Sequence, residues 1–251
     1  MTIDLNFDGG EGCDDAALMS FVTSVNVACG GHTGDAASMR AAVRLAKAHG
    51  AAVNAHPSTP DRESFGRARR DMTPAAVARF TADQVGALLA VLRAEGVPLA
   101  GVKPHGALYH ASSLSFEIAR ALLDGVVAAA GEEAGTLVFL SSPGSALLDA
   151  ARERRYRAAA EGFADRGYEP DGSLVARTGP GALITDPRAA ADQALSIARG
   201  EGAVARDGSR LDLQVDTICF HGDTPGAPAI AAAVRRALDE AGIAVAPLSI
   251  L

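Results

Sequence analysis

The chain has 251 residues, of which 48% are hydrophobic and 21% are charged, which is ordinary for a globular protein with a sizeable core. The formal net charge of −7 opposes binding to nucleic acid or to an anionic membrane surface. An acidic small-molecule substrate would therefore need local Arg or Lys side chains to hold it.

The three cysteines, Cys13, Cys29 and Cys219, are odd in number and lack pair spacing, so they do not indicate a disulfide framework or a zinc knuckle. The N-terminus shows no basic region followed by an apolar stretch, so we expect no signal peptide. No uncharged apolar run reaches the length of about 18 residues that a membrane helix needs. We therefore expect a cytoplasmic protein that does not bind a membrane.

Short β-like runs alternate with longer helical runs along the chain. The predicted strands cover residues 3–8, 23–29, 51–55, 99–103, 136–140, part of 156–163, and 214–220. The predicted helices lie between Asp35 and Gly50, between Thr73 and Gly96, and over about 114–130, 144–153, 187–199 and 227–241. Apolar residues spaced three and four apart and the cap residues Asp35, Thr73 and Gly50 support the helices.

Repeated alternation of strand and helix predicts a parallel sheet that is covered by helices. Seven such units without a linker or a break in composition favour one closed (β/α) barrel domain over residues 1–251.

Polar residues follow each predicted strand. In a barrel these residues lie at the C-terminal ends of the strands, which is where catalytic groups project. Five of the six histidines fall there. The polar residues at this predicted rim are Asp8, Glu11, Asn26, His32, His56, Lys103, His105, His110, Glu161, Asp165, Arg166, His221 and Asp223.

Carboxylates, imidazoles and one lysine suit general acid–base activation of water, with or without a metal. No Ser or Cys lies in a nucleophile-elbow motif, and no Gly-rich phosphate-binding fingerprint is present. Several rim residues could supply three or four ligands to a divalent ion. Simpler roles are also open, namely turn capping for Asp8 and Glu11 and helix N-capping for Asp223.

Six motifs in order resemble the LamB/YcsF family. They are Asp4-Leu5-Asn6-x-Asp8-x-Gly10-Glu11, Ser24-Val25-Asn26-Val27-Ala28-Cys29-Gly30-x-His32-x-Gly34-Asp35, Ala55-His56-Pro57-Ser58-x-Pro60-Asp61, Val102-Lys103-Pro104-His105-Gly106-Ala107-Leu108-Tyr109, Phe163-Ala164-Asp165-Arg166-x-Tyr168, and Asp216-Thr217-Ile218-Cys219-x-His221-Gly222-Asp223. The sequence departs from the family's usual pattern at several rim positions, including Gly31 where Phe is expected.

The resemblance implies an irregular seven-stranded (β/α) barrel, similar to the glycoside hydrolase/deacetylase barrel. It also implies one component of an ATP-dependent 5-oxoprolinase, which opens 5-oxoproline (pyroglutamate) to glutamate together with subunits B and C. The complex would use ATP, with phosphoryl transfer carried by the partners and hydrolysis completed by this chain.

On this basis we predict three groups of site residues. The predicted catalytic residues are Asp8, Glu11, His56, Lys103 and His105, with Asp8 or His56 as the base. The predicted substrate-binding residues are Asn6, Asn26, Arg67, Asp165, Arg166, Arg177, His221 and Asp223. If a divalent metal binds, its predicted ligands are His32, His56 and His221.

Two other functions are compatible with the same residues. One is a metal-dependent deacetylase-like amidohydrolase, which the histidine-rich rim suggests. The other is a non-catalytic component that only binds its partners, and for that role the strand-end carboxylates would be superfluous. A homo-oligomer is also possible.

Overall fold

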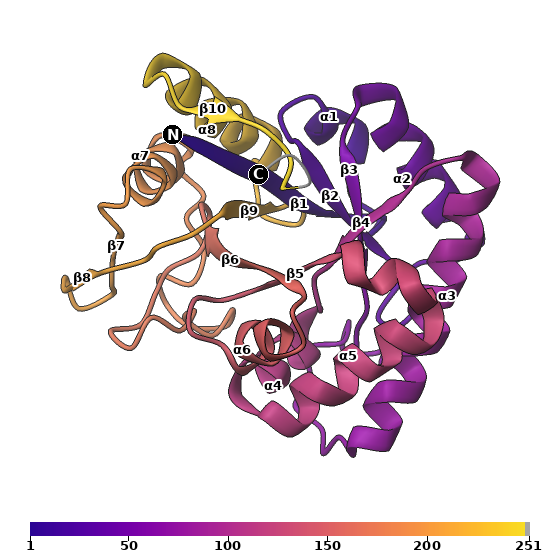
Figure 1. Cartoon of the computed structure of the whole chain (residues 1–251). Helices are drawn as coiled ribbons and strands as arrows, with labels where there is room; N and C mark the ends of the chain where they lie inside the picture. Colours follow the sequence, from indigo (N-terminus) through magenta and orange to yellow (C-terminus); the bar gives the residue numbers. More distant parts are fainter. Residues whose placement is uncertain (249–251) are drawn as a thin grey trace.

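The computed structural model describes residues 1–248, and its main feature is a closed barrel of seven parallel strands (Figure 1). Each strand pairs with the next in chain order, and the last closes the barrel by pairing with the first. The barrel strands are β1 (Thr2–Gly9), β2 (Ser24–Ala28), β3 (Ala52–His56), β4 (Leu99–Val102), β5 (Val138–Ser141), β6 (Arg157–Phe163) and β9 (Thr217–His221). The predicted seven-stranded barrel is confirmed.

Helices surround the barrel on the outside (Figure 1). They are α1 (Asp15–Met19), α2 (Ala36–His49), α3 (Pro74–Glu95), α4 (Gly106–Leu114), α5 (Phe116–Ala130), α6 (Ala146–Glu153), α7 (Pro187–Ala198) and α8 (Ala227–Glu240), with a 3₁₀ turn η1 (Gly131–Thr136). Two very short strands, β7 (Ala203–Val204) and β8 (Arg210–Leu211), form an antiparallel pair outside the barrel, and β10 (Ala244–Val245) adds to the start of β1.

The helix ends follow the capping chemistry that the sequence predicts. The Asp35 side chain accepts hydrogen bonds from the backbone of Ala37 and Ser38 at the start of α2, and Gly50 ends that helix in the left-handed region. Thr73 caps α3 directly before Pro74. The strand and helix bounds agree with the prediction to within one or two residues over most of the chain.

The structure differs from the prediction in three places. The helix expected at about 114–130 is present as α5, but an additional helix, α4, precedes it, and the two meet at Ser115, which caps α5. The last barrel strand begins at Thr217 rather than at Gln214. In addition, Glu161 lies within β6 rather than after it.

The side chains of β1 alternate between apolar and polar residues, and the barrel interior beside this strand is polar. Leu5 and Phe7 are fully buried among apolar residues. Asp4, Asn6 and Asp8 are also buried, but their side chains contact polar groups of neighbouring strands. Successive side chains of a strand point to opposite faces of the sheet. The polar set therefore faces the interior of the barrel, and the apolar set faces the helices.

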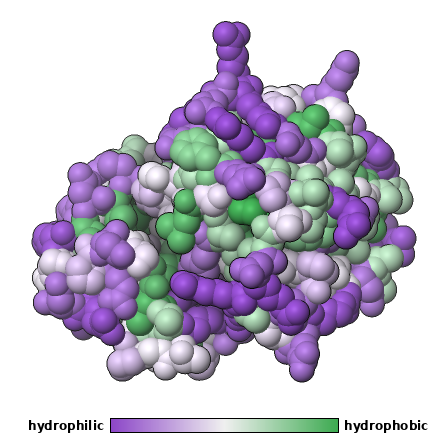
Figure 2. Space-filling model, turned by 90° about the horizontal axis from the view of Figure 1, so that it is seen from below, coloured by the Kyte–Doolittle hydropathy of each residue, from purple (hydrophilic) through white to green (hydrophobic). Residues whose placement is uncertain are grey.

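Helix α3 contains an 18-residue window with a mean hydropathy of 1.4, so by length and composition it could span a membrane. It packs against α2 and α5 and buries eight residues, including Val77 and Leu88. That is the environment of a core helix in the outer layer of a barrel. On the face of the molecule shown in Figure 2, hydrophobic residues form small patches between hydrophilic ones.

Candidate active site at the barrel rim

Residues from five barrel strands and the loops after them meet at the C-terminal end of the barrel. Asp8 pairs with His221 across the β1–β9 ladder and with Asn26 across the β1–β2 ladder. Glu11 and His32 come from the loops after β1 and β2, and His56 ends β3. Lys103 and His105 follow β4. These side chains therefore lie together at one end of the barrel, as the sequence predicts.

A ladder of asparagine amides holds Asp8 in place. The Asn26 amide donates to Asn6 Oδ1 at 2.7 Å and to Asp8 Oδ1 at 2.9 Å. Asn54 in turn donates to Asn26 Oδ1 at 3.0 Å. Asn6 and Asn26, which we predicted to bind substrate, are fully buried and hydrogen-bonded within the barrel. In this position they contact each other and Asp8, and substrate binding by these two residues stays a prediction.

Lys103 lies at the centre of a buried ionic cluster. Its Nζ is 2.9 Å from Asp8 Oδ1, 3.0 Å from Glu161 Oε1 and 3.1 Å from Cys219 Sγ. Burial disfavours the ammonium, but the neighbouring acidic groups, Asp8 foremost, hold the pKa of Lys103 well above its usual value. Burial also opposes ionisation of Asp8, yet His56 and Lys103 hold the Asp8 pKa well below its usual value. Both groups are therefore charged at neutral pH.

Three imidazoles surround the Glu11 carboxylate. Glu11 Oε1 lies 2.7 Å from His32 Nε2, 3.3 Å from His105 Nδ1 and 3.7 Å from His56 Nε2. Burial lowers the pKa of His32, and it lowers that of His105 well below its usual value. Burial also disfavours the charged form of His56, but the negative charge of Asp8 outweighs this effect, so the pKa of His56 is raised. The cluster thus combines one carboxylate with imidazoles of different basicity.

The described residues contain two groups whose donor atoms lie close enough to share a metal ion. One is Glu11, His32, His56 and His105, and the other is Asp8, Cys219 and His221. Within each group the donor atoms lie within 4.8 Å of one another. The predicted ligands His32, His56 and His221 are divided between the two groups, so neither group contains all three. His221 lies on the opposite side of Asp8, because it ends β9, which pairs with β1.

His221 forms a dyad with Asp165. The Asp165 carboxylate lies 3.0 Å from His221 Nδ1 and also accepts from the backbone amide of His221 and the hydroxyl of Thr224. Burial opposes ionisation of Asp165, but His221 and these hydrogen bonds lower its pKa. His221 Nε2 lies 4.0 Å from Asp8 Oδ2. The dyad resembles the pairs in which a carboxylate orients a histidine for proton transfer.

Three arginines that we predicted to bind substrate already have partners within the chain. Arg67 and Arg177 both pair with Asp223, at 2.7 Å and 2.8 Å. Asp223 therefore bridges two loops and does not cap α8, which begins after Gly226. Arg166 donates to the carbonyl oxygens of Ala182 and Val175, and burial lowers its pKa to about 10. Its contacts hold a loop together.

One further site residue, Phe65, carries no clear signal in the sequence. Phe65 has a positive φ of 56°, and its carbonyl oxygen accepts from His105 Nε2 at 3.0 Å. Such backbone strain in a non-glycine residue often occurs at functional sites. Glu161, which the sequence analysis places at the rim, is the only charged residue in the Ala158–Phe163 stretch of β6 and is buried beside Lys103.

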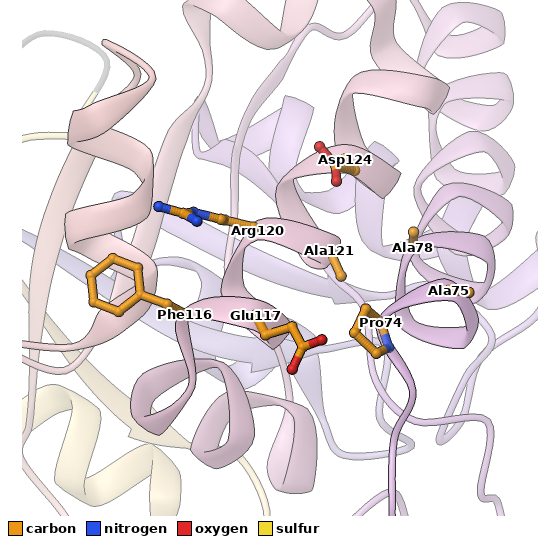
Figure 3. A pocket seen from close by; sticks show the side chains of 8 residues that line it. All are labelled: Pro74, Ala75, Ala78, Phe116, Glu117, Arg120, Ala121 and Asp124. Carbon is orange, nitrogen blue, oxygen red and sulfur yellow. The ribbon is translucent and has the colours of Figure 1, made fainter.

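A surface pocket on the outer helices, of about 540 Å³, contains none of these residues (Figure 3). It lies between the first turns of α3 and α5. Its lining residues are Pro74, Ala75, Ala78, Phe116, Glu117, Arg120, Ala121 and Asp124. The pocket has no cluster of imidazoles or cysteines, so the rim is the better candidate for chemistry.

Comparison with known proteins identifies the family. Residues 3–251 match the model of the LamB/YcsF family. Proteins named as the A subunit of 5-oxoprolinase from Chloroflexus aggregans and Pyrococcus furiosus are 48% and 44% identical; the alignments cover 98% and 99% of this chain and 98% of each relative. The crystal structure of a lactam utilization protein from Thermus thermophilus has a TM-score of 0.89 and 41% identity, covering 98% of this chain and 99% of that one. The chain therefore belongs to the LamB/YcsF family.

Proposed function

We propose that this chain is the A subunit of a cytoplasmic, ATP-dependent 5-oxoprolinase, and that it completes the hydrolysis of 5-oxoproline to glutamate together with subunits B and C. The names of full-length relatives support the substrate and the complex. The observation that carries a hydrolytic role is the rim itself, where an ionised carboxylate, a buried ammonium and a carboxylate-oriented histidine meet.

Hydrolysis of a lactam-derived intermediate needs a positioned water molecule and a base that accepts a proton from that water. It also needs positive charge near the substrate oxygen that becomes an anion. The Asp165 carboxylate favours the tautomer in which His221 Nδ1 carries the hydrogen, so Nε2 is free to accept a proton from water. The side chain of His221 is 11% exposed, whereas both nitrogens of His56 face protein groups. We therefore assign His221 as the base, with Asp8 beside it orienting the water.

The proposed role of Lys103 is electrostatic. Its ammonium is fixed between Asp8 and Glu161, so it need not reorganise when negative charge develops on the substrate. We propose that Glu11 and His105 act through the imidazole cluster and that Arg67 and Arg177, held by Asp223, form the basic edge that an acidic substrate meets. ATP is used by the complex and bound by the partner subunits.

The direct test is reconstitution with the cognate B and C subunits. Glutamate release from 5-oxoproline and ATP is measured with the wild-type chain and with the chain omitted. The proposal predicts turnover only when all three subunits are present. If B and C release glutamate equally well without this chain, the proposed function is wrong.

The imidazole cluster favours a second candidate, a metal-dependent amidohydrolase that needs neither ATP nor partners. The isolated chain would then hydrolyse amide or N-acetyl compounds in the presence of a divalent metal and lose that activity on chelation. If the isolated chain hydrolyses amide or N-acetyl compounds without ATP, this second function would replace the first proposal.

A further inference from the structure

The hydrogen bonds on the outer nitrogens of His56 and His105 define which ring nitrogens are free. His56 Nδ1 lies 2.7 Å from the carbonyl oxygen of Lys103, and His105 Nε2 lies 3.0 Å from the carbonyl oxygen of Phe65. A carbonyl can only accept, so both of these nitrogens carry hydrogens. In the neutral rings, His56 Nε2 and His105 Nδ1 therefore have free lone pairs. Histidines that bind metals typically donate their other nitrogen in this way.

The two free nitrogens and one carboxylate oxygen form a compact triangle. His56 Nε2 and His105 Nδ1 are 3.0 Å apart, and Glu11 Oε1 lies 3.3 Å from the second and 3.7 Å from the first. Ligands about 2.0–2.1 Å from a tetrahedral zinc ion are about 3.3 Å from one another. The spacing therefore suits three ligands of one ion, and two histidines with one glutamate are a common set in catalytic zinc sites.

His32 is excluded from this triangle by the orientation of its ring. The His32 and His105 rings are stacked with their centroids 3.7 Å apart and an interplanar angle of 3°. Ring lone pairs lie in the ring plane, so two parallel stacked rings cannot both direct one at the same ion. His32 Nε2 instead contacts Glu11 Oε1 at 2.7 Å, and Ser58 Oγ contacts His32 Nδ1 at 2.9 Å. His32 thus orients the carboxylate.

The surrounding charge favours a cation at this position. Glu11 supplies one negative charge, and the Asp8 carboxylate, 3.4 Å from His56 Nε2, supplies a second that is partly balanced by Lys103. Two facing imidazole nitrogens with free lone pairs repel each other unless a cation lies between them, either a proton or a metal ion. A metal ion satisfies both nitrogens and the carboxylate at once.

We propose that Glu11, His56 and His105 bind one divalent transition metal ion, with Zn²⁺ best matched to the donor atoms, and that His32 is a positioning residue for Glu11. When bound, such an ion polarises a carbonyl group or lowers the pKa of a bound water. The inference does not depend on the proposed function, because binding can be measured without turnover.

The test measures metal binding by the full-length chain. The protein is stripped with a chelator and equilibrated with micromolar Zn²⁺ for elemental analysis, or with Co²⁺ for its visible absorption spectrum. We expect about one ion per wild-type chain. His56→Ala and His105→Ala should lose the ion and the spectrum, and His32→Ala should bind about 10- to 100-fold more weakly. His49→Ala and Cys13→Ser control for surface histidine and thiol binding.

His221→Ala separates this site from the ligand set that the sequence suggested. It should retain the ion, and so should Glu161→Gln, which alters the neighbouring ionic cluster. Circular dichroism of each variant checks its folding. The inference is overturned if the wild-type chain retains no ion at micromolar concentration, or if folded His105→Ala binds like wild type. It is also overturned if His221→Ala abolishes binding while His105→Ala does not.

Discussion

Replacing Lys103 by Met tests the buried ionic cluster on which the site depends. Methionine has a similar length and no charge, so the substitution removes the ammonium with little change in volume. Asp8 and Glu161 then remain buried with exposed fractions of 5% and 0%. Glu161 Oε2 already has no hydrogen-bond partner among residues 1–248. The variant therefore leaves two carboxylates without the cation that lies within 3.0 Å of both.

Removal of one partner from a buried ion pair costs about 3–5 kcal/mol. In a chain of this size, 1 kcal/mol corresponds to about 2–4 °C in Tm. We therefore expect Lys103→Met to lower Tm by about 10 °C. Adding Glu161→Gln removes one of the two uncompensated charges, so the double variant should recover about half of the lost free energy of unfolding.

The assay is urea denaturation of the wild type, both single variants and the double variant, analysed as a double-mutant cycle. A loss below about 1 kcal/mol for Lys103→Met would show that the ammonium does not balance buried charge. The reasoning would also be refuted if the double variant were less stable than Lys103→Met. Removal of the Glu161 charge would then not relieve the cost of an unpaired buried carboxylate.

Two further predictions concern stability. Burial raises the Asp4 pKa to about 6; the folded state therefore holds the proton more tightly, and stability from this group falls as pH rises from about 4 to 6. The difference in unfolding free energy between the wild type and Asp4→Asn (wild type minus variant) should fall by about 2 kcal/mol between pH 4 and pH 7. Urea denaturation at each pH measures this difference, and a difference that does not change with pH would contradict the prediction. A Cβ on Gly31 would collide with Ser58 Oγ and Gln84 Oε1, so Gly31→Ala should cost about 1–3 kcal/mol. The matched Gly86→Ala, in open space within α3, should stabilise by about 0.5–1 kcal/mol; equal Tm values would refute the packing argument.

Most of the barrel could be predicted because its strands and helices carry local signals. Asp35, Thr73 and Gly50 mark helix ends by their own capping chemistry. Helix α4 was missed because its start depends on tertiary contacts. Gly106 has a φ of 53° and lies against the carbonyl of Gly66, which the sequence around it does not reveal.

The site could be predicted as a set of residues but not as a network. Placement after a strand identifies rim residues, whereas their partners depend on the order of strands around the barrel. Asp223 accepts from Arg67 and Arg177, which are 156 and 46 residues away. His221 was grouped with His32 and His56 because chain position does not indicate on which side of Asp8 a side chain lies. The ring orientation of His32 likewise depends on its stacking with His105 and on its contacts with Ser58 and Glu11, which are distant in the sequence.

The most direct test of a catalytic rim is glutamate release by the reconstituted three-component complex with His221→Ala beside His49→Ala. His49 lies exposed at the end of α2, so its variant should match the wild type. Loss of a positioned general base typically costs about 10²- to 10⁴-fold in rate. We predict a loss of that size for His221→Ala in a complex that still assembles. Wild-type turnover by the assembled His221→Ala complex would contradict the account.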